Sequence, residues 1–281
     1  MKFDLHCHST ASDGSLSPDV VLQRAVDAGV ELFALTDHDT LQGFCQLQAV
    51  PAGLTLVSGI ELSTVWSGVS IHVVGLDFDP VHPALLSMIE TLRLAREQRA
   101  HMIDSRLADR GMPGALAGAL QYCPDIGQLG RPHFAEYLRA AGYVASSNEA
   151  FDKWLGSGKI GDIKTVWPSL EAVVASIVDA GGVAVLAHPL RYKMTFSKLR
   201  RLVAAFREAG GRAVEVVGSS MQGEQKKQLW QLVQAMQLAG SGGSDFHSPE
   251  WQWAQIGHLE PLPAFITPVW DCFQHTRITA A

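Results

Sequence analysis

The segment DLHCHS (residues 4–9) pairs a strand pattern with chemically active side chains. Because side chains alternate between the two faces of a strand, His6 and His8 share one face. Leu5 and Cys7 share the other face, so Cys7 is expected in the core and not among the ligands. Two imidazoles one pleat apart can bind a single transition-metal cation. Taken alone, however, the motif is equally consistent with a pair of surface histidines.

Similar strand patterns alternate with helical patterns along most of the chain. The expected strands are residues 2–8, 31–36, 54–60, 70–76, 183–187, 212–217 and a short strand before Asp245. The expected helices are residues 18–28, 41–49, 170–180, 199–209 and 226–238. This alternation predicts an α/β fold built from βα units around a mainly parallel sheet, and it favours a barrel over a sandwich.

The alternation stops between about residues 83 and 167. Apolar residues at helical spacing predict one long amphipathic helix there; they are Leu85, Ile89, Leu92, Ile103 and Leu107. Shorter helical pieces separated by glycines follow. We therefore expect a barrel formed by residues 1–83 and 168–281, with residues 84–167 inserted as a helical substrate-recognition domain.

Composition limits the possible functions of the chain. A length of 281 residues with 47% hydrophobic residues allows a sizeable core. A net charge of −6 argues against extended nucleic-acid binding, which needs a basic surface. A phosphate substrate stays compatible with this charge, since bound divalent cations would dominate the local field.

The cysteines and the apolar runs bear on localisation. The four cysteines show neither CxxC pairing nor tight spacing, so no disulfide framework or thiolate zinc site is expected. The sequence shows no apolar run suited to a signal peptide or a membrane span. We expect a soluble cytoplasmic protein that does not bind membranes, whose oligomeric state the sequence leaves open.

Further metal-competent side chains stand at strand ends or on one strand face. His38 lies in TDHD (residues 36–39), directly after an expected strand, and the carboxyl ends of parallel strands are where barrel active sites form. The others are Asp13 in a Ser-Asp-Gly turn, Glu61, His72, His188, Asp245 and His247. Each has an ordinary explanation by itself, and Asp37 and Asp39 fit orienting or helix-capping roles. Together they predict a metal centre.

These motifs, in this order, resemble the polymerase and histidinol phosphatase (PHP) superfamily. The resemblance spans nearly the whole chain and rests on DLHCHS, TDHD, GIELS (residues 59–63), the strand residue His72, AHP (187–189) and GSDFH (243–247). It implies a distorted (β/α)7 barrel. GRPHF (130–134) and AHPLRY (187–192) look like the branch that hydrolyses nucleoside 3′,5′-bisphosphates and trims short 5′-phosphorylated RNA.

The resemblance also implies a ligand map for two to three divalent cations. The first position would be held by His6, His8, Glu61 and Asp245, the second by Asp13, His38 and His247, and the third by Glu61, His72 and His188. The donor types suit manganese, iron or zinc, and the branch resemblance favours manganese. The expected nucleophile is a metal-bridging hydroxide, with no protein nucleophile.

Substrate contacts are expected in the inserted segment. The resemblance implies phosphate contacts at Arg96, Arg99, Arg131 and His133. Arginine can grip a phosphate with two parallel hydrogen bonds. The alternative for Arg93, Arg96 and Arg99, which follow three-residue spacing, is a solvated charged helix face. Lys159 and Arg191 are weaker candidates, whose roles the sequence does not decide.

The leading function is removal of the 3′-phosphate from a nucleoside 3′,5′-bisphosphate. One alternative is 5′-to-3′ hydrolysis of short 5′-phosphorylated RNA, and another is histidinol-phosphate hydrolysis, against which GRPHF counts. An amidohydrolase would usually use a bridging carboxylated lysine where this chain offers Glu61. The non-enzymatic alternative is a metal-stabilised accessory module, against which the full ligand set argues.

Overall fold

The chain divides into two units, each with its own hydrophobic core. The structure is a computed structural model, and it describes residues 1–47, 49–219, 221 and 223–276. The first unit comprises Met1–Ile89 and Pro168–Ala281, and the second comprises Glu90–Trp167.

The first unit contains two sheets. A parallel three-stranded sheet has the order β1 (Phe3–Asp4), β2 (Leu32–Ala34) and β3 (Thr55–Val57). A mixed five-stranded sheet has the order β4 (Gly59–Trp66), β5 (Val69–Leu76), β6 (Val183–Leu186), β7 (Ala213–Gly218) and β8 (Ala239–Gly243). β5 runs antiparallel to both of its neighbours, whereas β6, β7 and β8 are parallel.

The expected (β/α)7 barrel is not confirmed, because the described strands form two sheets and no closed ring. The expected strand 54–60 is divided at Ser58, and β4 then continues to Trp66 as a strand that the sequence analysis missed. Ser67 and Gly68 adopt φ values of 47° and 72° and reverse the chain into β5. A two-residue turn can join only antiparallel strands, so β4 and β5 interrupt the parallel pairing that the alternation of strands and helices predicted.

Close backbone approach links β1 to β8. The Leu5 amide donates to the Gly242 carbonyl at 3.1 Å, and the Asp245 amide donates to the His6 carbonyl at 2.8 Å. A Cβ atom on Gly243 would lie 2.1 Å from the His6 Cβ, so only glycine permits this approach. The segments DLHCHS and GSDFH are therefore held side by side.

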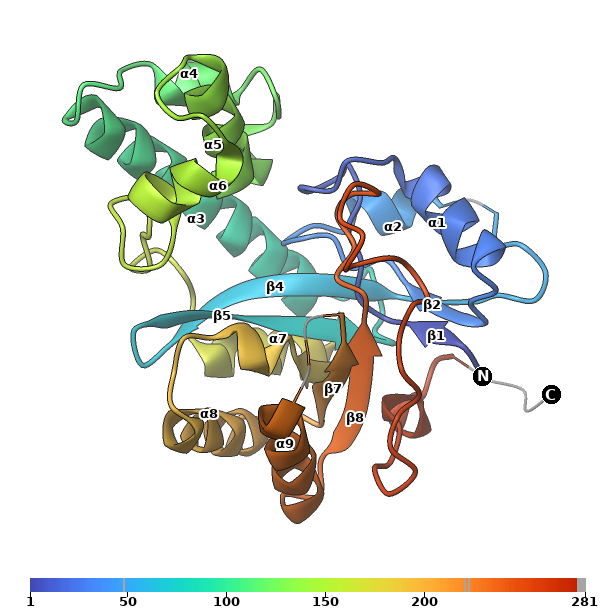
Figure 1. Cartoon of the computed structure of the whole chain (residues 1–281). Helices are drawn as coiled ribbons and strands as arrows, with labels where there is room; N and C mark the ends of the chain where they lie inside the picture. The colour runs from blue at the N-terminus through green and yellow to red at the C-terminus, as the bar shows by residue number, and fades with distance from the viewer. Residues whose placement is uncertain (48, 220, 222, 277–281) are drawn as a thin grey trace. The chain divides into compact units, whose positions relative to one another are not determined.

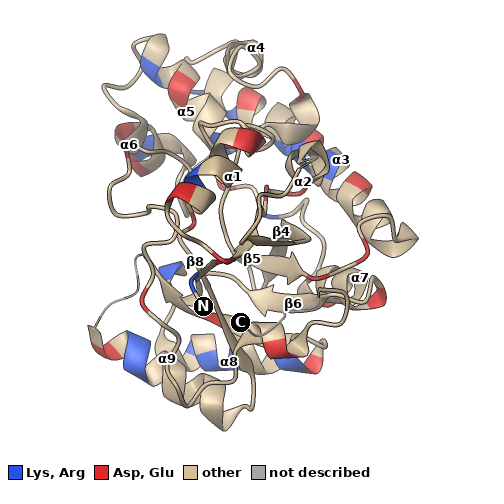
Figure 2. Ribbon diagram, turned by 90° about the vertical axis from the view of Figure 1, so that its right-hand side faces the viewer, with Lys and Arg blue, Asp and Glu red and all other residues tan. Residues whose placement is uncertain are grey.

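The helices of the first unit confirm the helical patterns. They are α1 (Pro18–Asp27), α2 (Gln42–Gln46), α7 (Leu170–Asp179), α8 (Phe196–Glu208) and α9 (Gly223–Ala235), with short turns η3 (Pro189–Arg191) and η4 (Val269–Cys272). α2 is shorter than the expected helix 41–49, of which residue 48 lies outside the described residues. α7 packs on β4, β5 and β6, and α9 packs on β7 and β8 (Figure 1). Charged side chains are carried by α8 and α9 (Figure 2).

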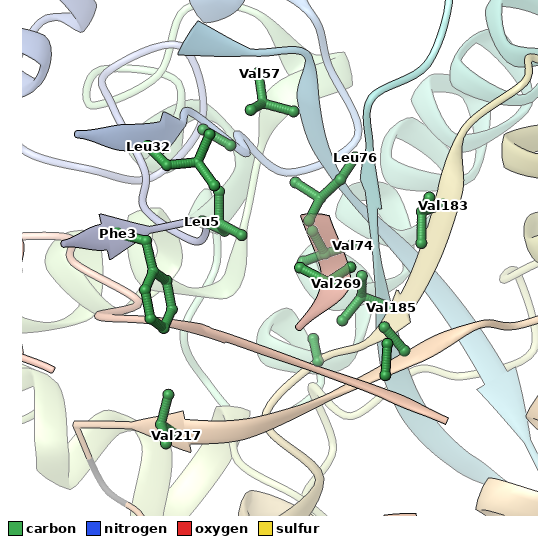
Figure 3. Packing of buried hydrophobic residues seen from close by; sticks show 14 residues of the cluster. Phe3, Leu5, Leu32, Val57, Val74, Leu76, Val183, Val185, Val217 and Val269 are labelled. Carbon is green, nitrogen blue, oxygen red and sulfur yellow. The ribbon is translucent and has the colours of Figure 1, made fainter. Parts of the chain in front are cut away.

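The core of the first unit lies between the strands of the two sheets. Leu5, Leu32 and Val57 come from the three-stranded side, and Val74 and Val185 come from the five-stranded side (Figure 3). All five are at most 1% exposed. Burying an apolar side chain of this size stabilises the fold by about 1.5–3 kcal/mol. This apolar packing fixes the strands that carry the metal-competent residues.

The second unit is helical. It contains the greater part of α3 (Pro83–Ala108), then α4 (Ala115–Ala119), η1 (Ile126–Gln128), α5 (Arg131–Ala140), α6 (Ser147–Ala150) and the π-helical turn η2 (Phe151–Leu155). The expected long amphipathic helix is α3, and its residues Ile103 and Leu107 are fully buried in the core of this unit. Among the described residues, no helix combines the length and apolar character needed to cross a lipid bilayer.

Candidate metal centre

The metal-competent residues singled out in the sequence gather in the first unit. They come from the segments that follow β1, β2, β6 and β8, and from β4 and β5 themselves; they are His6, His8, Asp13, His38, Glu61, His72, His188, Asp245 and His247. Strand ends and the two sheets thus deliver side chains from distant parts of the sequence to one place.

The first group centres on the two histidines that follow β1. His6 Nε2 lies 3.1 Å from His8 Nε2 and 3.2 Å from Glu61 Oε2. His8 Nε2 lies 3.1 Å from Asp245 Oδ1, and His6 Nε2 lies 3.6 Å from the same oxygen. Ligand atoms about 2.0–2.2 Å from a tetrahedral metal are about 3.3–3.6 Å apart, so these atoms are spaced as ligands of one cation would be.

The second group surrounds Asp13. His247 Nε2 lies 3.3 Å from Asp13 Oδ1, and His38 Nε2 lies 3.8 Å from Asp13 Oδ2. His8 also faces this group, with Nδ1 4.0 Å from Asp13 Oδ1. The expected map placed His8 with the first cation alone, whereas in the structure its two ring nitrogens face different groups.

Glu61 connects the groups, because its two carboxylate oxygens face different histidines. Oε2 lies 3.0 Å from His38 Nδ1 and also faces His6 and His8, which follow β1. Oε1 lies 2.9 Å from both His72 Nδ1 and His188 Nε2. A carboxylate in this arrangement can bind two cations at once, one through each oxygen.

Buried polar atoms in the cluster indicate that cations fit it. Within the described part of the chain, several of its atoms are buried without a hydrogen-bond partner; they are His8 Nδ1, Asp13 Oδ1, His38 Nδ1, Glu61 Oε2 and His188 Nδ1. An unsatisfied buried polar group costs about 1–3 kcal/mol. Coordination of divalent cations would satisfy such atoms, and these nitrogen and oxygen donors suit manganese, iron or zinc.

The carboxylates of the cluster are held in their ionised form. Burial alone would raise the pKa of Glu61, but the charges of His38 and His6 hold that pKa well below its usual range. The pKa of Asp13 is likewise lowered against the effect of burial, mainly by His38 and His247. An ionised carboxylate is the form that binds a cation.

Glu215, in the middle of β7, supports two of the histidines. One of its oxygens lies 2.6 Å from His6 Nδ1, and the other accepts the backbone N–H of His188 at 2.6 Å. The first contact directs His6 Nε2 toward the metal centre, as carboxylates commonly do for ligating histidines. The second holds His188 at a φ of 27°, which is unfavourable for a residue with a side chain. The sequence analysis missed Glu215; the available signal was an acidic residue within the apolar run 213–217.

Asp37 and Asp39 orient the loops that carry ligands. Asp37 accepts hydrogen bonds from the backbone N–H and hydroxyl of Ser9, and from the hydroxyl of Ser12. It therefore fixes the turn that presents Asp13. Asp39 accepts from the backbone N–H and hydroxyl of Ser63, which lies on β4 two residues beyond Glu61. Of the two expected roles, orientation is the one that these contacts support.

The expected phosphate-binding residues lie in the second unit. Arg96 and Arg99 are only 5% and 8% exposed, and the Arg99 guanidinium lies 4.6 Å from the ring centroid of Trp167. These two arginines are therefore not part of a solvated helix face, unlike Arg93, which pairs with Glu90 on the surface. Arg131 begins α5, and burial lowers its pKa.

The remaining candidates have separate surroundings. The His133 ring accepts the Gly130 amide at 2.9 Å, beside Arg131. The Arg131 guanidinium donates to the Leu155 carbonyl at 3.1 Å. In the first unit, Arg191 forms an ion pair with Asp245, which brings it next to the first ligand group. In the second unit, Lys159 is exposed, and its backbone amide donates to the Gly156 carbonyl at 3.0 Å.

Comparisons with known proteins cover nearly the whole chain. The PHP domain family matches residues 4–106. A 5′-3′ exoribonuclease from Haemophilus influenzae is 39% identical, over 97% of this chain and 99% of that protein. A 3′,5′-nucleoside bisphosphate phosphatase from Chromobacterium violaceum is 38% identical, over 95% of this chain and 94% of that protein. The solved structure of an amidohydrolase from Chromobacterium violaceum with bound sulfate shares 37% identity and a TM-score of 0.88, covering 96% of this chain and 95% of that chain.

The arrangement around Glu61 predicts the effect of its removal. Loss of a residue that supports a metal ligand costs roughly 10- to 100-fold in metal affinity, and Glu61→Gln should cost more than that. The reason is that the side-chain amide, unlike the carboxylate, cannot bind one cation through each of its two terminal atoms. Metal content after gel filtration measures this. Cys7→Ala is the matched control, since Cys7 is fully buried on the opposite strand face. Loss of metal from Cys7→Ala but not from Glu61→Gln would refute the ligand assignment.

Glu215→Gln tests the supporting role of that carboxylate. The amide can accept only through its oxygen, so either His6 or the His188 backbone loses its acceptor. We expect metal affinity, measured by competition with a chelator, to fall about 10- to 100-fold while the far-UV circular dichroism stays unchanged. Glu208→Gln, an exposed change on α8, is the control. An unchanged affinity in Glu215→Gln would contradict this role.

Proposed function

The chain belongs to the PHP family of phosphate-ester hydrolases, and we propose that it removes the 3′-phosphate from nucleoside 3′,5′-bisphosphates to leave the 5′-monophosphate. One observation carries the proposal. The Glu61 carboxylate is buried between two sets of ligand-type side chains, which suits a centre that holds more than one divalent cation around a phosphoryl group. The similarity to a bisphosphate phosphatase over most of both chains supports the choice of substrate.

The chemistry requires a charged, water-restricted site, and the chain's own residues supply it. When bound, divalent cations lower the pKa of water and neutralise phosphoryl charge; manganese is the proposed ion, with iron or zinc as alternatives. His6, His8 and Glu61 are at most 1% exposed, so their electrostatic interactions are weakly screened. Glu215 keeps His6 and His188 in position, and Asp37 fixes the turn that presents Asp13. No side-chain nucleophile is required by this scheme.

Recognition of the phosphate that does not react is assigned to the second unit. We propose that residues 84–167 form the substrate-recognition domain, with Arg96, Arg99, Arg131 and His133 as its phosphate-binding residues. The burial of Arg96 and Arg99 supports this, since an arginine with little exposure interacts more strongly with an anion than a solvated one does. Arg131 begins α5, and the dipole of a helix favours an anion such as phosphate at its N-terminus.

A second candidate is 5′-to-3′ hydrolysis of short 5′-phosphorylated RNA. It is favoured by the 39% identity to an exoribonuclease that this chain matches along almost its full length. The two candidates share one requirement, a terminal 5′-phosphate next to a 3′-phosphoryl group. They differ in the bond that is broken, which is a phosphomonoester in the first and a phosphodiester in the second.

The direct test is product analysis with adenosine 3′,5′-bisphosphate as the substrate. Metal-stripped protein should be inactive, and added Mn²⁺ should restore release of one phosphate with adenosine 5′-monophosphate as the product. A 5′-phosphorylated trinucleotide, assayed in parallel, ranks the second candidate. Full activity in metal-free protein, or formation of adenosine 3′-monophosphate, would contradict the proposal.

Arg131→Ala separates recognition from chemistry. Loss of one charge-assisted phosphate contact costs roughly 1.5–3 kcal/mol, or about 10- to 150-fold in kcat/KM. We expect this loss with adenosine 3′,5′-bisphosphate and a much smaller one with an aryl phosphate, which lacks the second phosphate. Arg139→Ala is the control, because Arg139 lies on the same helix but is exposed and paired with Glu136. Equal losses on both substrates would show that Arg131 serves the reacting group or the fold.

A further inference from the structure

Two tryptophans form an exposed aromatic surface on the first unit. Trp251 is 42% exposed and Trp253 is 52% exposed. Their rings are stacked, with centroids 5.6 Å apart and an interplanar angle of 13°. Contiguous exposed apolar surface is unfavourable in water, and on soluble proteins it usually marks a binding site. We call these two side chains the Trp pair.

Both tryptophans of the Trp pair lie next to the candidate metal centre. The Trp251 ring centroid lies 5.3 Å from that of His247. The Arg191 guanidinium carbon lies 5.4 Å from the Trp253 ring centroid, and the same guanidinium pairs with Asp245. A row of contacts therefore runs from His247 through the Trp pair and Arg191 to Asp245. All of these residues belong to the first unit.

The chemistry of this surface favours a nucleobase as its occupant. Every base offers a flat π face, and stacking on tryptophan is the usual way in which proteins bind unpaired bases. The guanidinium beside Trp253 adds a positive charge that suits the adjoining sugar phosphate. In a nucleotide, a single sugar separates the base from its 3′-phosphate. A base on the Trp pair would therefore have its 3′-phosphate near the candidate metal ligands, because the Trp pair directly contacts His247. A sugar phosphate has no flat ring that would stack on the Trp pair.

We propose that the Trp pair is a stacking platform for the base of the nucleotide substrate, and that it selects nucleotides over other phosphate monoesters. This inference rests on the proposed function and adds the feature that distinguishes a nucleotide from a sugar phosphate. With short RNA, the same platform receives the base next to the scissile phosphate.

The test compares two substrates that differ only in the base. They are adenosine 3′,5′-bisphosphate and the abasic 1-deoxyribose 3,5-bisphosphate, each assayed with the Mn²⁺-loaded protein. The quantity measured is the ratio of kcat/KM for the first to that for the second. Alanine in place of a stacking aromatic costs about 1–3 kcal/mol per base, so Trp253→Ala should lower the ratio about 5- to 150-fold. Trp253→Phe keeps a flat ring and should retain most of the ratio.

Two additions make the test specific. Phe265→Ala is the control, because Phe265 is 53% exposed but packs against Trp230, on the surface of α9. The second readout is the fluorescence of 2-aminopurine riboside 5′-monophosphate, a product analogue whose emission is quenched by stacking. Quenching should occur with wild type and Trp253→Phe, and it should be lost with Trp253→Ala.

The outcomes separate this inference from the function on which it rests. If wild type releases phosphate from neither bisphosphate, the proposed function is wrong, and the fluorescence readout still decides whether the Trp pair binds a base. If wild type hydrolyses both substrates equally well, or if Trp253→Ala leaves their ratio unchanged, the stacking platform is refuted. Metal content and circular dichroism of each variant exclude loss of the fold as the cause.

Discussion

The burial of one carboxylate governs the arrangement of the first unit. Glu61 is 1% exposed, and removing an ionised carboxylate from water costs several kcal/mol unless positive charge or hydrogen bonds compensate. Histidines from the segments after β1, β2 and β6, and from β5, surround its two oxygens. This environment holds the pKa of Glu61 well below its usual range despite burial. The ends of β1, β2 and β6 and the middle of β5 therefore supply the partners that compensate this charge.

Much of the site could be predicted, because the information is local. Alternation along a strand places His6 and His8 on one face, and a polar residue after an apolar run marks a strand end. The hairpin of β4 and β5 was missed even though Ser67-Gly68 is a turn signal, because the apolar run before it was read as one strand ending at Ile60. Glu215 was missed because its partner, His6, is distant in sequence. Such contacts depend on strand order, which no local pattern encodes.

Close packing of backbone links the fold to its chemistry. Gly243 lets β8 approach β1, so that Asp245 reaches His8. Gly43 has a similar role, since a Cβ there would meet a carboxylate oxygen of Asp37 at 2.0 Å. The loop that Asp37 holds carries Asp13. Small residues at these two places give charged groups room to meet, while the apolar core between the sheets keeps the strands in position (Figure 3).

The proposed function requires that the Glu61 carboxylate hold two cations. Electron paramagnetic resonance of the Mn²⁺-loaded protein tests it directly, because two Mn²⁺ ions that share a carboxylate are magnetically coupled. Wild type at full loading should give the spectrum of coupled ions, and Glu61→Gln should give only isolated ions or none. A wild-type spectrum of isolated Mn²⁺ alone, at full loading, would contradict the account.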